Sequence, residues 1–207
     1  MDGSDAETSE TAGENGSTGP DPRHFDLSSA TVEELVATTQ SVKTATLNAA
    51  DREERDGPLS SVLVAISGGP HSGATVDLAK ALADEADAWV ELFHVAPAGD
   101  ASDAAGAGDA ASDPGTYHPD GDRLLAAAVD RLGGFERADR WLVEGDTPAE
   151  EIVEQSTYYD AVIVGASTTG TVGRFVFGCT TDAVVDDAAV PVIVVEGDGS
   201  TTLIDGD

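Results

Sequence analysis

The sequence predicts an α/β protein with a five-stranded parallel sheet and helices on both faces of that sheet. Short, continuously apolar segments such as SVLVAI, residues 61–66, are typical of parallel strands because both faces of such strands are buried. These segments alternate with stretches in which apolar residues recur at helical spacing. Strands and helices that alternate in this way build a parallel sheet covered on both sides.

The first half of the alternation begins with the strand at residues 61–66. A helix is expected over residues 72–86, where apolar residues such as Leu78 and Leu82 repeat at helical spacing. The apolar segment AWVELFHV, residues 88–95, predicts the second strand. Residues 96–119 follow, rich in alanine, glycine and aspartate, and are expected to form a long flexible insert.

The second half repeats the same alternation. Apolar residues recur at helical spacing over residues 124–132, and two glycines end that helix. Another helix is expected to begin at Pro148, because proline suits the first helical position. The remaining predicted elements are strands at residues 138–143 and 161–164, a helix at residues 179–188, and a last strand from Pro191 to Val195.

Segments outside this alternation are expected at both ends of the chain. Residues 1–25 are almost free of apolar side chains, which predicts disorder. An amphipathic helix is expected over about residues 32–55, because Thr31 and Glu34 can form a capping box and apolar residues follow on one face. The expected organisation is an acidic N-terminus with this helix at residues 1–58, the α/β domain at residues 59–196, and a polar tail at residues 197–207.

The composition is strongly acidic. The 207 residues include 40 acidic and 10 basic side chains, for a net charge of −30, and only two of the basic residues are lysines, Lys43 and Lys80. Such a surface repels itself at low salt, and near-molar salt shortens the Debye length to about 3 Å. We therefore expect a protein of the halophilic type, from a salt-rich cytoplasm. The charge argues against binding of nucleic acid or anionic lipid.

Further features of the chain bear on its location. Cys179 is the only cysteine, so an internal disulfide is excluded. No apolar run reaches the length of about 18 residues that a membrane span needs, which predicts no membrane insertion. The N-terminal MDGSDAETSE lacks the basic and apolar parts of a secretion signal. We expect a soluble, cytoplasmic protein.

The stretch from Ala161 to Val195 is the most informative for function. Its apolar strand ends at Gly165, a loop of small residues follows, and Gly178 precedes a new helix. Glycine at a strand end lets the backbone approach a ligand, and the free N–H groups of a helix start favour an anion. This arrangement predicts a nucleotide-phosphate site at the carboxyl edge of the sheet. Both glycines can instead simply shape the turns, and the residues leave this alternative open.

This stretch resembles the ATP-binding segment of the universal stress protein family. The nucleotide-binding members of that family carry Gly-x2-Gly-x9-Gly followed by Ser or Thr. Gly165 and Gly178 match the first and third glycines, whereas Thr168 replaces the second and Cys179 replaces the hydroxyl residue. The motif is therefore degenerate. The order of strands and helices over residues 60–196 and the segments GDTPAEEI and PVIVV are similar to the family as well.

The resemblance implies a Rossmann-like fold, related to that of the adenine nucleotide alpha hydrolases. It implies the strand order 3-2-1-4-5, with a cleft for ATP between strands 1 and 4. It also implies a homodimer through the last strand, Pro191 to Val195, whose edge would otherwise be open. Nucleotide-binding members usually carry an aspartate after the first strand. The matching residue here is Ser67, which lacks the two acceptor oxygens of a carboxylate.

The residues expected at the nucleotide site come from the ends of three strands and from the start of the last helix. Arg174 can either meet a phosphate or pair with one of the many nearby acids. The full set is Ala65, Ile66, Ser67, Val95, Val164, Gly165, Ser167, Thr168, Arg174, Gly178, Cys179, Thr180 and Thr181.

The loop after the first strand has a second resemblance. SGGPHS, residues 67–72, is similar to the Ser-Gly-Gly-x-Asp-Ser motif of PP-loop ATP pyrophosphatases, with His71 in place of the aspartate. Glycines before a helix start can cradle pyrophosphate through backbone N–H groups. A glycine turn that feeds the first helix is the competing interpretation. The four histidines do not cluster in the sequence and no metal-binding motif is present, so we expect no metal and no catalytic residues.

These observations predict a regulatory or stress-response module, not an enzyme, with a degenerate nucleotide site. Two alternatives stay open. One is a competent ATP-binding switch with slow hydrolysis at most. The other is an interaction module for a membrane transporter, since stress-protein domains also occur attached to transporters.

Overall fold

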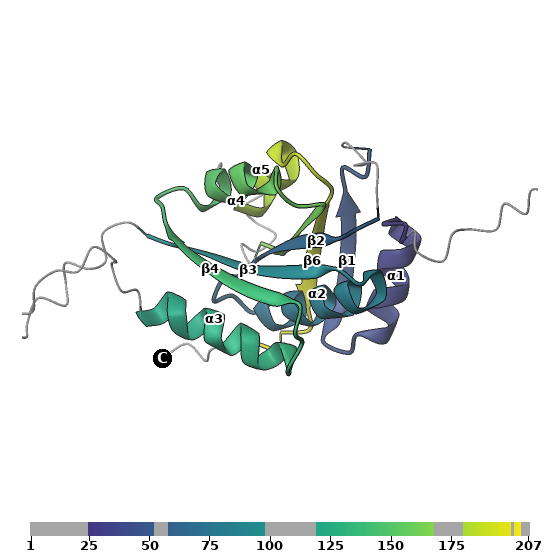
Figure 1. Cartoon of the computed structure of the whole chain (residues 1–207), viewed down its shortest axis with the longest axis horizontal. Helices are drawn as coiled ribbons and strands as arrows, with labels where there is room; N and C mark the ends of the chain where they lie inside the picture. The colour runs from purple at the N-terminus through teal and green to yellow at the C-terminus, as the bar shows by residue number, and fades with distance from the viewer. Residues whose placement is uncertain (1–24, 52–57, 98–118, 168–179, 200, 204–207) are drawn as a thin grey trace, which may run out of the picture.

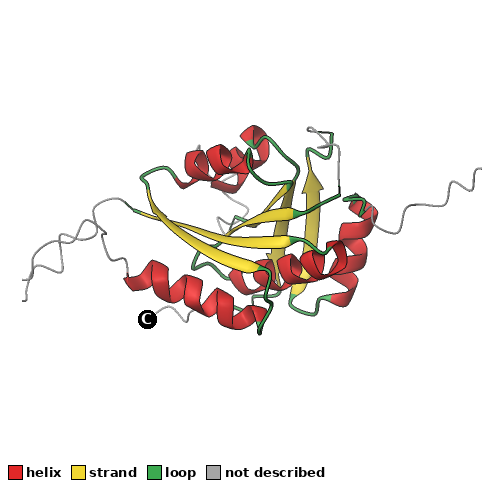
Figure 2. Ribbon diagram, viewed as in Figure 1, coloured by secondary structure: helices red, strands yellow, loops and turns green. Residues whose placement is uncertain are grey.

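The described part of the chain folds around one mixed sheet of six strands, of which five are parallel (Figures 1 and 2). The computed structural model describes residues 25–51, 58–97, 119–167, 180–199 and 201–203. The strands are β1 (Val42–Asn48), β2 (Ser61–Ala65), β3 (Trp89–Ala96), β4 (Ala138–Glu144), β5 (Ala161–Gly165) and β6 (Val192–Gly197). Their order in the sheet is β1-β6-β5-β2-β3-β4. Without β1, this is the predicted order 3-2-1-4-5, which is confirmed.

Helices cover both faces of the sheet, as predicted (Figure 1). They are α1 (Ser29–Thr38), α2 (Ser72–Ala86), α3 (Pro119–Leu132), α4 (Pro148–Ser156) and α5 (Thr180–Asp187). The first three lie on one face, where their buried side chains form one core with strand residues such as Val62 and Ile163. The last two lie on the other face and close a second core around Leu63 and Val162.

The prediction of a helix over about residues 32–55 is wrong beyond Thr38. The helix begins one turn earlier, where the Ser28 hydroxyl accepts a hydrogen bond from the Thr31 N–H at 3.3 Å, and it ends at Thr38. The chain then turns into β1. Branching at Cβ restricts the side chains of threonine and valine in a helix and suits them to a strand. The segment VKTATLN contains three such residues, which accounts for the change.

Strand β1 adds a sixth, antiparallel strand at the edge of the sheet. It pairs along β6 from Val42 opposite Gly197 to Asn48 opposite Val192, with an irregularity between Val42 and Thr44. The homodimer expected through the last strand, Pro191 to Val195, rested on an open edge at that strand. That premise is wrong, because the chain's own β1 occupies the edge.

The segment after β6 also contacts the sheet domain. The Gly73 N–H donates to the Thr201 carbonyl at 2.9 Å, and the Leu203 N–H donates to the Ser72 hydroxyl at 3.3 Å. The Leu203 side chain packs against the core cluster that contains the buried residues of α2. Within the expected polar tail at residues 197–207, Gly197 therefore ends β6, and the described residues 201–203 dock on the start of α2.

Two further expectations fall wholly or mostly outside the described residues. They are the disorder of residues 1–25 and the flexibility of the insert at 96–119, of which residues 1–24 and 98–118 are not described. Among the residues that are described, no helix is long and apolar enough to cross a membrane.

Candidate functional site

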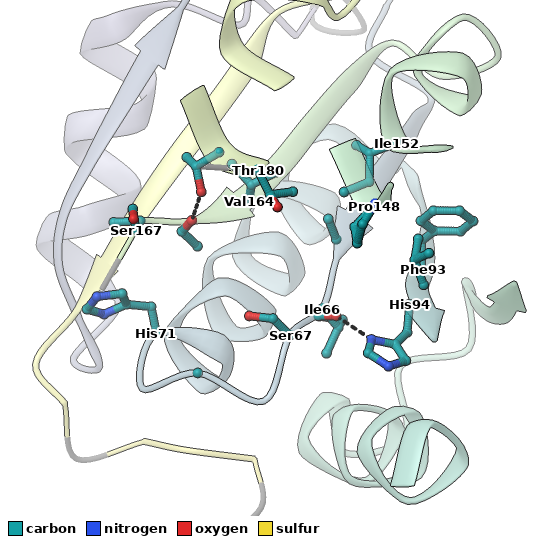
Figure 3. A pocket seen from close by; sticks show the side chains of 16 residues that line it. Ile66, Ser67, His71, Phe93, His94, Pro148, Ile152, Val164, Ser167 and Thr180 are labelled. Atoms are coloured by element: carbon teal, nitrogen blue, oxygen red, sulfur yellow. Dashed lines mark hydrogen bonds between the residues drawn. The ribbon is translucent and has the colours of Figure 1, made fainter. Parts of the chain in front are cut away.

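A cavity of about 350 Å³ opens at the carboxyl ends of β2, β3 and β5 (Figure 3). Strand β2 pairs with β3 on one side and with β5 on the other, so the chain crosses from one half of the sheet to the other at this place. In open α/β sheets, ligands bind at such a reversal, in the crevice outside the carboxyl ends of the strands. The volume lies within the range of pockets that bind small molecules.

The cavity brings together every predicted site residue that the structure describes. The strand ends of β2 and β5 and the start of α5 converge there although they are far apart in the sequence. These residues are Ala65, Ile66, Ser67, Val95, Val164, Gly165, Ser167, Thr180 and Thr181. The other predicted residues, Thr168, Arg174, Gly178 and Cys179, lie outside the described part of the chain.

The lining has an apolar part and a polar part. Ile152 of α4 and Val164 of β5 belong to the second core and reach the cavity from its buried side. On the polar side, the Thr181 hydroxyl donates to the Gly165 carbonyl at 2.9 Å, which ties the start of α5 to the end of β5. Ser67 contributes a hydroxyl where the family pattern carries a carboxylate.

The absent side chain of Gly165 points toward α2. A Cβ added there would lie 3.4 Å from the Cβ of His71 and 3.4 Å from the Thr75 hydroxyl oxygen. Both distances are ordinary van der Waals contacts, so the start of α2 leaves room for a side chain at this position. The φ of Gly165 is not positive, so the turn does not require glycine here, and its backbone lines the cavity.

Two histidines line the cavity and were not predicted as site residues. The Ile66 carbonyl lies 2.8 Å from Nδ1 of His94, and because a carbonyl only accepts, this nitrogen carries the proton. The Gly197 N–H donates to Nδ1 of His71 at 3.1 Å, which leaves the His71 proton on Nε2. Figure 3 shows the two rings on opposite sides of the cavity, with Ser67 between them.

Other lining residues were also missed. They are Gly69, Phe93, Pro148, Ile152 and Ala166. Ala166 lies between the predicted residues Gly165 and Ser167, so its place could have been found from the sequence. Phe93 lies two residues before Val95 and pairs across the sheet with Ala65. Pro148 and Ile152 reach the cavity only because α4 packs over the second core, and no local pattern indicates this.

The arrangement at SGGPHS does not favour a pyrophosphate cradle. The Ser72 N–H donates to the Gly69 carbonyl at 3.1 Å, and the Gly73 N–H donates to the Thr201 carbonyl at 2.9 Å. The Ser72 hydroxyl donates to the same Gly69 carbonyl at 2.7 Å. Two backbone donors at the start of α2, the N–H groups of Ser72 and Gly73, are therefore already bonded within the chain.

Comparison with known proteins gives a family match over the sheet domain. The family model described as "Universal stress protein family" matches residues 59–196. No curated protein matches the chain.

Among solved structures, a universal stress protein in complex with cAMP is 19% identical, with a TM-score of 0.53 over 68% of this chain and 98% of that one. A universal stress protein from Archaeoglobus fulgidus is 18% identical, with a TM-score of 0.52 over 79% of this chain and 54% of that one. A functionally unknown protein from Pseudomonas aeruginosa is 14% identical, with a TM-score of 0.51 over 84% and 61% of the respective chains. At these identities, the likeness shows a shared fold.

Proposed function

Because the chain belongs to the universal stress protein family, we propose that it is a cytoplasmic stress-response module whose cavity holds an adenine nucleotide weakly. One observation carries the proposal. Residues from the ends of β2, β3 and β5 and from the start of α5, chosen from the sequence, line a single cavity at the reversal point of the sheet. The role is regulatory, with occupancy of the cavity as the regulated state.

The two parts of the cavity suit the two parts of a nucleotide. Ile66, Val95 and Ile152 provide apolar surface of the kind that a flat base contacts. The backbone of residues 165–167 and the hydroxyls of Thr180 and Thr181 provide polar groups for the sugar and phosphate. This division supports a nucleotide over a purely apolar ligand.

Charge supports weak binding of a triphosphate. Within the described lining, only His71 and His94 can carry a positive charge, and each already uses its Nδ1 in a hydrogen bond with the backbone. A chain with a net charge of −30 also repels an anionic ligand. Ser67, Thr168 and Cys179 stand where the family's binding motif has other residues, and each lost bond to a charged group costs about 1.5–3 kcal/mol.

Calorimetry at 2 M potassium chloride tests the proposal with AMP, cAMP and ATP. The unaltered chain should bind ATP with a Kd no tighter than millimolar. The combined variant Ser67→Asp, Thr168→Gly and Cys179→Ser should gain measurable ATP affinity, because it restores the family motif. Adding Thr180→Trp, which fills the mouth of the cavity, should abolish that gain, whereas adding Thr157→Trp, an exposed position outside the cavity, should preserve it.

Two results would overturn this assignment in different ways. Micromolar ATP binding by the unaltered chain would show a competent ATP-binding switch in place of a degenerate site. A combined variant that remains folded and binds none of the three nucleotides would show that the cavity does not serve nucleotides.

A further inference from the structure

Part of the sheet face beside α4 is open to solvent and carries both tryptophans of the chain. Phe93 of β3 is buried in the second core, on the face that α4 and α5 cover. Side chains alternate along a strand, so Trp89 and Glu91 of β3 lie on the same face as Phe93. The parallel pairing of β3 with β4 sets Asp139 beside Glu91 and Trp141 beside Phe93.

The two indole rings remain accessible in this region. Trp89 is 44% exposed and Trp141 is 42% exposed, although tryptophan usually buries most of its surface. The buried Phe93 ring holds the Trp141 ring in place, because the two rings pack edge to face with centroids 5.6 Å apart. Trp141 is therefore a fixed, half-exposed aromatic surface.

Two neighbouring carboxylates lie on the same face as the tryptophans. Partial burial, and secondarily the charge of Asp139, raises the pKa of Glu91. Partial burial and the charge of Glu91 likewise raise the pKa of Tyr159, which follows α4. The ion pairs among the described residues involve the cations of Lys43, Arg123, Arg131 and Arg137, and none of them reaches Glu91 or Asp139. Two like charges thus stand side by side without a cation from the described part of the chain.

An arginine side chain complements such a surface in both respects. Its guanidinium group can bond a carboxylate in bidentate fashion, and its planar face stacks on an indole ring. A second copy of this chain would bring the same two carboxylates and tryptophans, so like charges would oppose that pairing. Nucleic acid and anionic lipid are opposed by the net charge of −30.

We propose that Trp89, Glu91, Asp139 and Trp141 form a docking surface for an arginine-bearing segment of a partner protein. The surface lies on the face of β3 and β4, and the carboxylates are held between the two tryptophans along the strands. The partner's guanidinium groups neutralise the carboxylates and cover the indole rings. This inference is independent of what the cavity binds.

Tryptophan fluorescence gives a selective test, because Trp89 and Trp141 are the only two tryptophans in the chain. The probe is a synthetic decapeptide of alternating arginine and alanine, added to the full chain in 1 M potassium chloride. At that salt concentration the Debye length is about 3 Å, so only close contacts between charges contribute. The peptide should change the fluorescence in a saturable way. A peptide with citrulline in place of arginine, which keeps the shape but not the charge, should bind at least tenfold more weakly.

A matched pair of double variants separates this surface from general acidity. Glu91→Gln with Asp139→Asn should weaken binding of the arginine peptide at least tenfold. Glu33→Gln with Glu34→Gln, which removes two exposed charges from α1, should change the affinity less than twofold. The first double variant removes a like-charge contact, so its thermal midpoint should equal or exceed that of the unaltered chain, which shows that a loss of binding is not unfolding.

Three outcomes would overturn the proposal. The first is peptide binding, seen by calorimetry, without a change in fluorescence. The second is an equal loss of affinity in both double variants, which would reveal attraction to the acidic surface in general. The third is fluorescence that changes with protein concentration in the absence of peptide, which would show that a second copy covers the surface.

Discussion

Replacing Leu35 by alanine tests whether α1 belongs to the core of the fold. Leu35 is 9% exposed and Val32 is 1% exposed, and both side chains belong to the cluster that contains buried residues of α2 and the sheet. Truncating a buried leucine to alanine costs about 2–5 kcal/mol. For a domain of this size, each kcal/mol lowers the thermal midpoint by about 2–4 °C. We therefore expect Leu35→Ala to lower the midpoint by about 4–20 °C.

Circular dichroism during heating, in 2 M potassium chloride, measures this shift. The matched control is Glu34→Ala, which changes an exposed residue of the same helix and should alter stability by less than about 0.5 kcal/mol. If both variants melt within a degree of the unaltered chain, α1 does not pack on the sheet. The N-terminal segment would then be dispensable for the fold of the sheet domain.

Three further perturbations address charge. The Asp160 carboxylate is partly buried, which raises its pKa, but it accepts bonds of 2.7–3.1 Å from the N–H and hydroxyl groups of Ser60 and Ser61, and the net effect lowers the pKa. Its contribution to stability is thus present above the unfolded-state pKa and is lost as pH falls through the folded-state pKa. Asp160→Asn should flatten the acid side of the plot of unfolding free energy against pH, and an unchanged acid limb would contradict this role. Glu91 has a raised pKa, so its contribution is present at low pH and is lost as pH rises through the folded-state pKa. Glu91→Gln should therefore raise the thermal midpoint at pH 7 relative to the unaltered chain. A lower midpoint would show that a cation stabilises the Glu91 carboxylate in the folded state. With a net charge of −30, the unaltered chain should melt at a steeply higher temperature in 2 M than in 0.1 M salt, and a constant midpoint would remove the case for salt adaptation.

The sheet domain could be predicted because its elements are encoded locally. The expected helix over residues 72–86 coincides with α2, since its apolar spacing leaves one consistent face to bury. The continuously apolar segments became the central strands β2 and β5, both of whose faces are buried. The order of the strands came from the family resemblance, because no local pattern specifies which strands are neighbours.

Strand β1 could not be predicted from its own sequence. Only Val42 of its seven residues is buried, so the alternation typical of a half-buried strand is weak. The strand exists because β6, about 150 residues later, offers an unpaired edge with a matching register. Strand propensity depends on such partners far more than helix propensity does. Part of the candidate site could not be predicted for the same reason, since α4 contributes Pro148 and Ile152 through tertiary packing alone.

The segments outside the family match are connected to the cavity through β6 and α2. Lys43 of β1 pairs with Glu196 at 2.7 Å, and the next residue, Gly197, donates its N–H to Nδ1 of His71 in the cavity wall. A Cβ at Gly197 would lie 2.8 Å from that of Ala74 on α2, so β6 and α2 are in close contact at this point. The Thr201 carbonyl accepts a hydrogen bond from the N–H of Gly73, which precedes Ala74 in the first turn of α2. Both extensions therefore support the loop that carries Ser67 and His71, so any change that releases β1 or the C-terminal segment should also alter the shape of the cavity.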